Sequence, residues 1–518
     1  MANALEKDLI IIGAGLNGLS AGLAYALNNP NQQKKVLILE KNPISGGYVT
    51  SFTRQGFQFD TTQMISNITD ILDYFGIRME FHNFTDDYIR VFKADPASRL
   101  IKTFEVFSPG KEFEEQFIKL FPDESANLKK FFAYSEAMFH EIYGLKYAPG
   151  FAGILKMLFT CPKVLGNMNK TFSQYLKMFG VDNPDVDLLF QVFSSMCGLP
   201  NERIAALLTV GVMYSLREKA YRPSGPFIDL PKKMEQRFSQ LGGEIFFKSE
   251  VEKILVERGS VRGIQLKGGE VIRSNSVIST VDVKTTIKDL VGLELVRSLN
   301  ARYAKKLEAV EMTTSTFTVN LGLDNTEILD RRGLHCGYAL LTSGSEAFPR
   351  LFAEFQNNHW GITPECFNIG LSCPPTADSK KPVLSIQALP VPVENWVSLR
   401  NGDRQRYLLE KEKTADLLID IVEKYLLPGL RGHILMKDIC TPATFVRYSG
   451  SPSGSIYDMA SVPANFGNHR LPVITPVRGL LLPKFAHGAF GSMNSGLQAV
   501  DILLKGQVMH GNSRFKKG

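Results

Sequence analysis

Residues 8–18 read DLIIIGAGLNG, and this stretch decides the fold. Its apolar part is a short run of the kind that a buried parallel strand needs, and the run stops at Gly13. Gly13, Gly15 and Gly18 then have the spacing G-x-G-x-x-G. The first glycine permits a tight turn, the second lets the backbone approach a bound group, and the third allows a following helix to pack near the strand. The stretch therefore predicts a strand, a glycine turn and a helix.

A second strand and an acidic residue continue the pattern. The predicted helix begins at Leu16, and Asn17 lies in its first turn. The N-terminus of this helix supplies N–H groups and positive potential for a pyrophosphate. Residues 36–39 form the next apolar run, which Glu40 ends 22 residues after Gly18. An acidic side chain at this place can accept both hydroxyls of an adenosine ribose, and it repels a 2′-phosphate. This order of elements predicts a Rossmann-type dinucleotide-binding domain.

Two further glycines follow the acid. Gly46 and Gly47 are able to bring a second backbone segment close to the same pyrophosphate. Lys41 comes before this glycine pair in the sequence, and Tyr48 directly follows it. Here the sequence resembles the FAD-dependent phytoene desaturase, carotenoid isomerase and retinol saturase superfamily, a branch of the amine-oxidase-like flavoproteins. Its members carry Glu-Lys, a short spacer, Gly-Gly and then an aromatic strand that ends in Phe-Asp. In this chain the matching residues are Glu40-Lys41, Gly46-Gly47 and residues 56–60. The resemblance implies FAD as the cofactor.

The resemblance also implies which later residues contact the cofactor. Val251 would pair its backbone with the adenine, and Thr280 would return the chain to the cofactor's side. Residues 479–482 match the family's approach strand, and residues 488–496 match its glycine-rich turn into the last helix. That turn would present N–H groups to the isoalloxazine ring. The residues expected there are Gly488, Gly491, Ser492 and Met493.

Three positions depart from the family's pattern. Tyr48 stands where many relatives have arginine, as it does in the isomerase and saturase branches. The acidic or amide residue that usually ends the approach strand is replaced near residues 483–485, and Asp458 stands where relatives have glycine.

The predicted architecture is α/β, with a Rossmann-type FAD-binding domain that is discontinuous in sequence and a substrate domain of mixed sheet plus helices. The predicted segments are FAD-binding parts at 1–90, 231–290 and 441–518, a mostly helical substrate- or membrane-facing region at 91–230, and a substrate-binding sheet with helices at 291–440. Periodicity predicts helices over much of 105–222, a hairpin or meander over 245–269, strands at 314–323 and 383–388, and a helix at 407–427.

Residues 144–168 are apolar and aromatic, with Lys146, Lys156 and Lys163 spaced along them and no acidic residue. Such a stretch can lie in a membrane interface with the lysines at the head groups. A cap helix over an apolar pocket has the same composition. Peripheral membrane contact and a pocket cover therefore both stay open.

Several classes of protein are disfavoured. A net charge of +7 over 518 residues is modest, is concentrated in a tail only at residues 514–517, which are expected to be solvated, and gives no sign of nucleic-acid binding. The six cysteines and eight histidines show no metal-ligand spacing, so we expect no metal site. Ser20 sits in a G-x-S-x-G pattern, but inside a helix rather than on the strand-to-helix turn that a serine hydrolase needs. Neither a secretory signal nor a long apolar span is visible, which favours a cytoplasmic protein.

The resemblance implies an FAD-dependent oxidoreductase or isomerase acting on a lipophilic polyene: a carotenoid, a retinoid or an unsaturated lipid. Desaturation, saturation and redox isomerisation of carbon–carbon bonds all remain open, as does the electron acceptor. Lys484 and His487 are the candidates for a catalytic role, because a cation beside the flavin would stabilise its reduced form. The alternatives are a non-catalytic lipid- or prenyl-binding protein of the GDP-dissociation-inhibitor type and a flavin amine oxidase.

Overall fold

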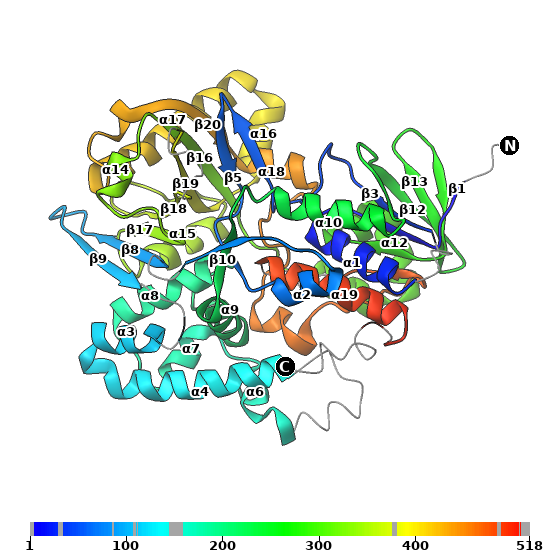
Figure 1. Cartoon of the computed structure of the whole chain (residues 1–518), viewed down its shortest axis with the longest axis horizontal. Coiled ribbons are helices and arrows are strands. Elements are labelled where there is room, and N and C mark those ends of the chain that lie inside the picture. Colours follow the sequence, from blue (N-terminus) through cyan, green and yellow to red (C-terminus); the bar gives the residue numbers. More distant parts are fainter. Residues whose placement is uncertain are drawn as a thin grey trace.

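The computed structural model describes residues 5–29, 35–84, 88–106, 110, 112–144, 159–374, 381–483, 488–506 and 508. Three regions are visible in Figure 1: a sheet with helices at the right, a second and larger sheet at the upper left, and a group of helices below that sheet. Each region contains segments that lie far apart in the sequence.

A five-stranded sheet, in which every neighbouring pair of strands is parallel, forms the first region. Its strand order is β11 (Glu244–Phe246), β3 (Val36–Leu39), β2 (Leu9–Ile12), β15 (Val277–Ser279) and β21 (Leu480–Leu481). Both β2 and β3 are completely buried, which explains their unbroken apolar sequences. Against the sheet pack α1 (Leu16–Leu27), α10 (Asp229–Gln240) and α19 (Gly488–Leu503), which lie side by side in Figure 1.

A second, smaller sheet packs on the opposite side. Its order is β1 (Leu5–Glu6), β14 (Val271–Arg273), β13 (Ser260–Leu266) and β12 (Val251–Glu257), and the last three strands form an antiparallel meander. The helices α11 (Val283–Thr285), α12 (Leu293–Leu299) and α13 (Ala301–Glu308) follow β15. The meander predicted over 245–269 is confirmed for β12 and β13 and continues into β14, but its expected first strand, β11, belongs to the parallel sheet instead.

The larger sheet has seven strands in the order β20, β16, β19, β18, β17, β8 and β9. Its strands are β8 (Ile89–Ala94), β9 (Ile101–Val106), β16 (Ser315–Leu323), β17 (Tyr338–Thr342), β18 (Asn368–Ser372), β19 (Val383–Val391) and β20 (Ile434–Cys440). Helices nearby are α14 (Glu327–Asp330), α15 (Ala347–Gln356), α16 (Glu394–Gly402), α17 (Arg404–Tyr425) and α18 (Pro442–Ser449). The strands predicted at 314–323 and 383–388 are neighbours, and the helix predicted at 407–427 is α17.

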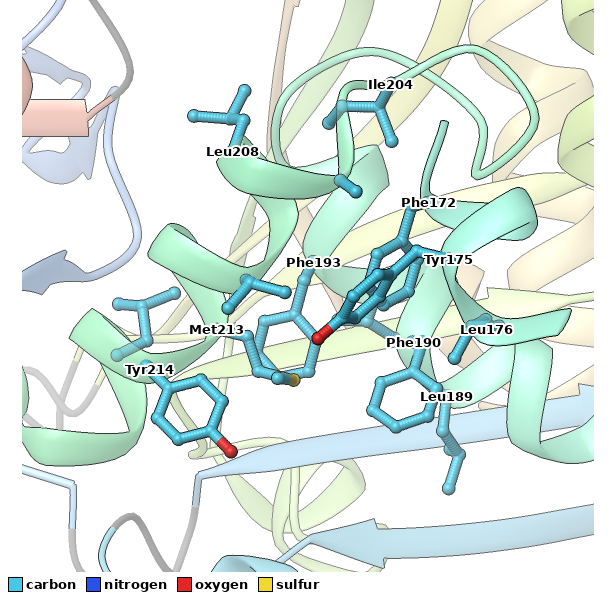
Figure 2. Packing of buried hydrophobic residues seen from close by; sticks show 14 of the residues in the cluster. Phe172, Tyr175, Leu176, Leu189, Phe190, Phe193, Ile204, Leu208, Met213 and Tyr214 are labelled. Atoms are coloured by element: carbon cyan, nitrogen blue, oxygen red, sulfur yellow. The ribbon is translucent and has the colours of Figure 1, made fainter. Parts of the chain in front are cut away.

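The helical region contains much of the chain's phenylalanine. Its helices are α3 (Glu112–Leu120), α4 (Ser125–Gly144), α6 (Pro162–Asn167), α7 (Phe172–Lys177), α8 (Pro184–Ser195) and α9 (Ala206–Glu218). Aromatic side chains from several of them pack edge to face: Phe172 packs so against Phe190, as Figure 2 shows, and Tyr175 packs so against Phe131. Residues 197–200 lie between α8 and α9 and interrupt the helical stretch predicted over much of 105–222.

Short elements connect these regions. A hairpin of β4 (Ser51–Arg54) and β5 (Phe57–Asp60) lies against the large sheet. A three-stranded sheet contains β6 (Ile65–Ser66), β10 (Ala220–Pro223) and β7 (Phe81–Asn83), with α2 (Thr69–Phe75) between β6 and β7 in sequence. The predicted α/β architecture, with a discontinuous Rossmann-type region and a second region of mixed sheet plus helices, is confirmed; the domain boundaries remain a prediction.

The expectation of a turn at 488–496 is wrong, because α19 is already helical from Gly488 onward. Packing explains the glycine there. A Cβ at Gly496 would overlap the Asn17 carbonyl oxygen of α1, so a glycine is needed where the two helices cross. Within the described ranges, no helix is long and apolar enough to cross a bilayer.

Candidate cofactor and substrate site

The glycine turn after β2 is built as the sequence predicts. Gly13 has a φ of +101°, and a Cβ there would lie 2.6 Å from the Thr280 hydroxyl oxygen. A Cβ at Gly18 would overlap the Gly13 carbonyl oxygen, so the third glycine lets α1 begin directly behind the turn. Helix α1 has no side-chain cap at Gly15, and the N–H groups of its first turn are therefore available to an anion.

Glu40 holds the turn and the segment after it together. One of its carboxylate oxygens accepts the backbone N–H of Ala14 at 2.9 Å, and the other accepts that of Asn42 at 2.8 Å. The N–H of Gly46 donates to the Ala14 carbonyl at 2.8 Å, and Gly15 and Gly46 form a parallel bridge. The second glycine pair therefore lies beside the first, at the carboxyl ends of the parallel strands.

A cavity of about 2190 Å³ begins at this turn and extends between the three regions of the molecule. Pockets for a single drug-sized ligand measure about 300–1,000 Å³, so this cavity has room for two ligands. Most of the residues predicted to bind the cofactor line it. They are Gly13, Gly15, Leu16, Asn17, Glu40, Lys41, Gly46, Gly47, Tyr48, Val251, Thr280, Gly488, Gly491 and Ser492.

Two predicted cofactor residues do not line the cavity. Gly18 lies behind the turn, where its role is close packing. The Met493 side chain is buried in the core between the helices and the parallel sheet, and its carbonyl accepts a hydrogen bond from the Ser20 hydroxyl at 2.7 Å. Both catalytic candidates, Lys484 and His487, lie outside the described residues.

Three buried polar atoms of the cavity wall have no hydrogen-bond partner among the described residues. They are the side-chain oxygens of Asn17, Thr50 and Tyr448. A buried polar atom without a partner is costly, so a ligand that supplies one is favoured. Together with the open N-terminus of α1 and the glycine cradle, these atoms fit a polar, phosphate-containing dinucleotide at this end of the cavity.

Helix α18 closes the end of the cavity near Glu40. The Arg447 carbonyl accepts from Lys41 Nζ at 3.0 Å, and the Tyr448 carbonyl accepts from Asn42 Nδ2 at 3.3 Å. Burial, with a smaller effect of the Glu40 charge, raises the pKa of Tyr448 to about 12. Burial lowers the pKa of Lys41, against the opposing effect of Glu40. Sequence patterns do not indicate α18 as part of the site, since 406 residues separate Lys41 from Arg447.

Away from the turn, one arm of the cavity runs into the helical region. Its walls are apolar and include Phe139, Val164, Leu207, Leu208, Val212 and Leu216. Tyr457 lies in the wall as well, and burial raises its pKa. Tyr48 donates to the Ser455 carbonyl at 2.9 Å, which ties the second glycine pair to the segment containing Tyr457.

Asp458 keeps the backbone shape that glycine would have. Its φ is +61°, in the left-handed region that aspartate tolerates better than most residues. The exchange of glycine for aspartate therefore leaves the local turn intact.

Among the described residues, the cysteines and acidic side chains do not assemble a metal centre. All six cysteines are unbridged thiols, five of them buried, and Cys440 lies half-buried in the cavity wall. No group of three or more histidine, cysteine, aspartate or glutamate side chains in the described ranges is arranged to hold a metal ion.

Comparison with known proteins finds similarity along most of the chain. The family model "NAD(P)-binding Rossmann-like domain" matches residues 11–69. Lycopene-forming phytoene desaturase of Pseudescherichia vulneris is 25% identical over 85% of this chain and 86% of its own length. Chloroplastic prolycopene isomerase of Daucus carota is 24% identical over 87% of this chain and 71% of its own. The inactive all-trans-retinol 13,14-reductase of Danio rerio is 22% identical over 96% of this chain and 85% of its own length.

Among solved structures, a redesigned putrescine oxidase aligns with a TM-score of 0.63, covering 97% of this chain and all of that one at 14% identity. The fold is therefore that of the amine-oxidase-like oxidoreductases. The Rossmann match and this fold together indicate a flavin-type cofactor.

Proposed function

We propose, from the confirmed resemblance to the phytoene desaturase, carotenoid isomerase and retinol saturase superfamily, that this protein is an FAD-dependent oxidoreductase of long apolar polyenes. One observation carries the proposal. A single cavity connects the glycine cradle at the parallel sheet with an apolar arm among α4, α6 and α9. A dinucleotide and a lipophilic chain therefore have adjoining places.

In this proposal the chain's own residues bind and orient. The first turn of α1 and the Gly46–Gly47 backbone would hold the pyrophosphate, and Glu40 would bind the adenosine ribose. The apolar arm excludes water and fixes the polyene. Bound FAD supplies the hydride acceptor or donor for desaturation, saturation or redox isomerisation of a carbon–carbon bond.

The visible absorbance spectrum of the purified protein tests the proposal. We expect a flavin spectrum that bleaches with dithionite, and release of a chromophore with the mass of FAD on denaturation. A protein that holds no FAD and cannot be reconstituted with it would contradict the oxidoreductase and would favour a lipid carrier. FAD together with rapid turnover of amines, and none of polyenes, would favour an amine oxidase.

Glu40→Gln is expected to weaken FAD binding about tenfold or more. The carboxylate accepts two backbone N–H groups, and an amide would point its NH₂ at one of them. The dissociation constant, measured by flavin fluorescence quenching on apoprotein, checks this. Glu6→Gln, on the exposed strand β1, is the control and should leave the constant unchanged. Equal constants for both variants would remove Glu40 from the site.

Contact with a membrane surface is a further part of the proposal. Lys146 and Lys156 lie outside the described residues. Lys163 is only partly exposed and is engaged, 3.5 Å from Glu141 and over the Tyr134 ring. Phe159 has 86% of its surface exposed, and this supports contact with lipid. Flotation with anionic liposomes should weaken when Lys146, Lys156 and Lys163 are all changed to glutamate; unaltered flotation would exclude this stretch.

A further inference from the structure

The cavity also contains a polar floor. The middle strand of this floor is β16, and alternate residues of β16 face opposite sides of the large sheet. Phe317, Val319 and Leu321 belong to the apolar core on one side. Thr316, Thr318 and Asn320 line the cavity on the other. A hydrocarbon pocket would be expected to have apolar residues on this side as well.

Neighbouring strands extend the polar floor sideways. Thr318 is paired with Gln387 of β19 and with Cys440 of β20, and Asn320 is paired with Asp438 of β20. All of these residues line the same cavity. Thr318 is 7% exposed and Asn320 only 3%, so the floor belongs to the interior rather than the outer surface.

Much of the hydrogen-bonding capacity of this floor is unused. Asn320 Oδ1 accepts from the Ser385 hydroxyl at 2.7 Å, but its Nδ2 has no partner in the described part of the chain. The Thr318 hydroxyl has none there either. Gln387 is contacted by Gln63 at 3.4 Å through its oxygen only, which leaves its NH₂ group open to the cavity. These polar groups face the cavity rather than close-packed protein, so a ligand bound there can supply the hydrogen-bond partners that the floor lacks.

The charged side chains beside the floor disfavour both anionic and cationic ligands. The Asp438 carboxylate repels a carboxylate ligand. Its own charge is already faced by Arg54, whose Nε lies 3.6 Å away, so a cationic ligand gains little. A hydroxyl group suits the floor best, because it can accept from an amide NH₂ and donate to a threonine or carboxylate oxygen.

We propose that the substrate is amphiphilic, a polyene bearing a hydroxyl group at one end, and that Thr318, Asn320 and Gln387 hydrogen-bond that hydroxyl. This inference rests on the proposed function and specifies its substrate class. The apolar arm takes the chain, and the β16–β19–β20 floor takes its polar end. A site built to bond a hydroxyl discriminates strongly against the analogue that lacks it.

Binding of two matched carotenoids tests the inference: β-carotene and β-cryptoxanthin, which differ by one ring hydroxyl. We expect purified holoprotein to bind the hydroxylated compound about tenfold or more tightly, measured as protein-bound pigment against concentration in detergent micelles. In Thr318→Val/Asn320→Leu, the ratio of the two dissociation constants should fall to about one. Gln387→Met is a milder second variant, and its ratio should fall in the same direction.

Thr342→Val is the matched control, because Thr342 is buried in the same sheet but does not line the cavity. Its ratio should equal that of the unmodified protein. Equal affinities for the two carotenoids, or a ratio that survives in Gln387→Met and in the double variant, would overturn the inference while leaving the proposed function intact. Binding of neither carotenoid by flavin-containing protein would overturn both, and a protein without flavin would fail at the earlier absorbance test.

Discussion

Gly18→Ala is expected to give a protein that purifies without flavin and has a free energy of unfolding lower by about 1–3 kcal/mol. The added methyl group would overlap the Gly13 carbonyl oxygen, and the backbone has to move to relieve this contact. Movement of Gly13 or of α1 disrupts the turn and the first helical turn together. Because both hold the same pyrophosphate in the proposed function, we expect the loss of cofactor to be larger than the loss of stability.

Flavin content per protein and denaturant unfolding of apoprotein measure the two effects separately. Gly402→Ala is the control, since that glycine ends α16, is exposed, and has no other atom within 4 Å of the place that a new methyl group would take. It should keep its flavin and its stability. A Gly18→Ala protein with full flavin content would show that the turn does not hold the cofactor.

Arg222→Met is expected to lower the free energy of unfolding by about 3–5 kcal/mol, because it leaves a buried carboxylate without its partner. Arg222 Nη2 lies 2.7 Å from Asp60 Oδ2, and both side chains are 7% exposed. The other Asp60 oxygen accepts the Phe227 N–H at 3.1 Å and a hydrogen bond from Ser51. The pair therefore joins the β4–β5 hairpin to β10 at the cavity wall.

Denaturant titration of apoprotein measures this effect without interference from the cofactor. Arg331→Met removes the exposed pair with Glu327, in which both side chains are 70% exposed, and should change stability by less than about 0.5 kcal/mol. A cost below about 1 kcal/mol for Arg222→Met would mean that water reaches Asp60 and that the hairpin is not fastened by this pair.

Local sequence patterns predicted the elements whose causes are local. The run before Gly13 and the alternation of residues 314–323 each contain their own strand signal, and both strands are present. The glycines at 488–496 were misjudged because their cause is not local. Gly496 is required by the backbone of α1, at the opposite end of the chain, and nothing near it in sequence shows that contact.

The residues of the candidate site likewise fall into those that local sequence patterns indicated and those that they did not. The glycine cradle and Glu40 form one short segment, so spacing alone indicated them. The polar floor combines residues of β16 such as Thr318 with Gln387 of β19 and Asp438 of β20, which become neighbours only through strand pairing. An alternating pattern showed that β16 has two faces, but it did not show that the polar one turns inward. The Asp60–Arg222 pair, 162 residues apart, gave no sequence signal at all.

The strand order of the parallel sheet also governs when the protein can mature. β2 and β3 are synthesised before β15 and β21, which complete their sheet, and α1 is synthesised before α19, on which it packs. A nascent chain that still lacks α19 therefore exposes the apolar surface of the N-terminal segment. Cofactor capture therefore waits for α19, and until that helix is made the exposed apolar surface favours aggregation.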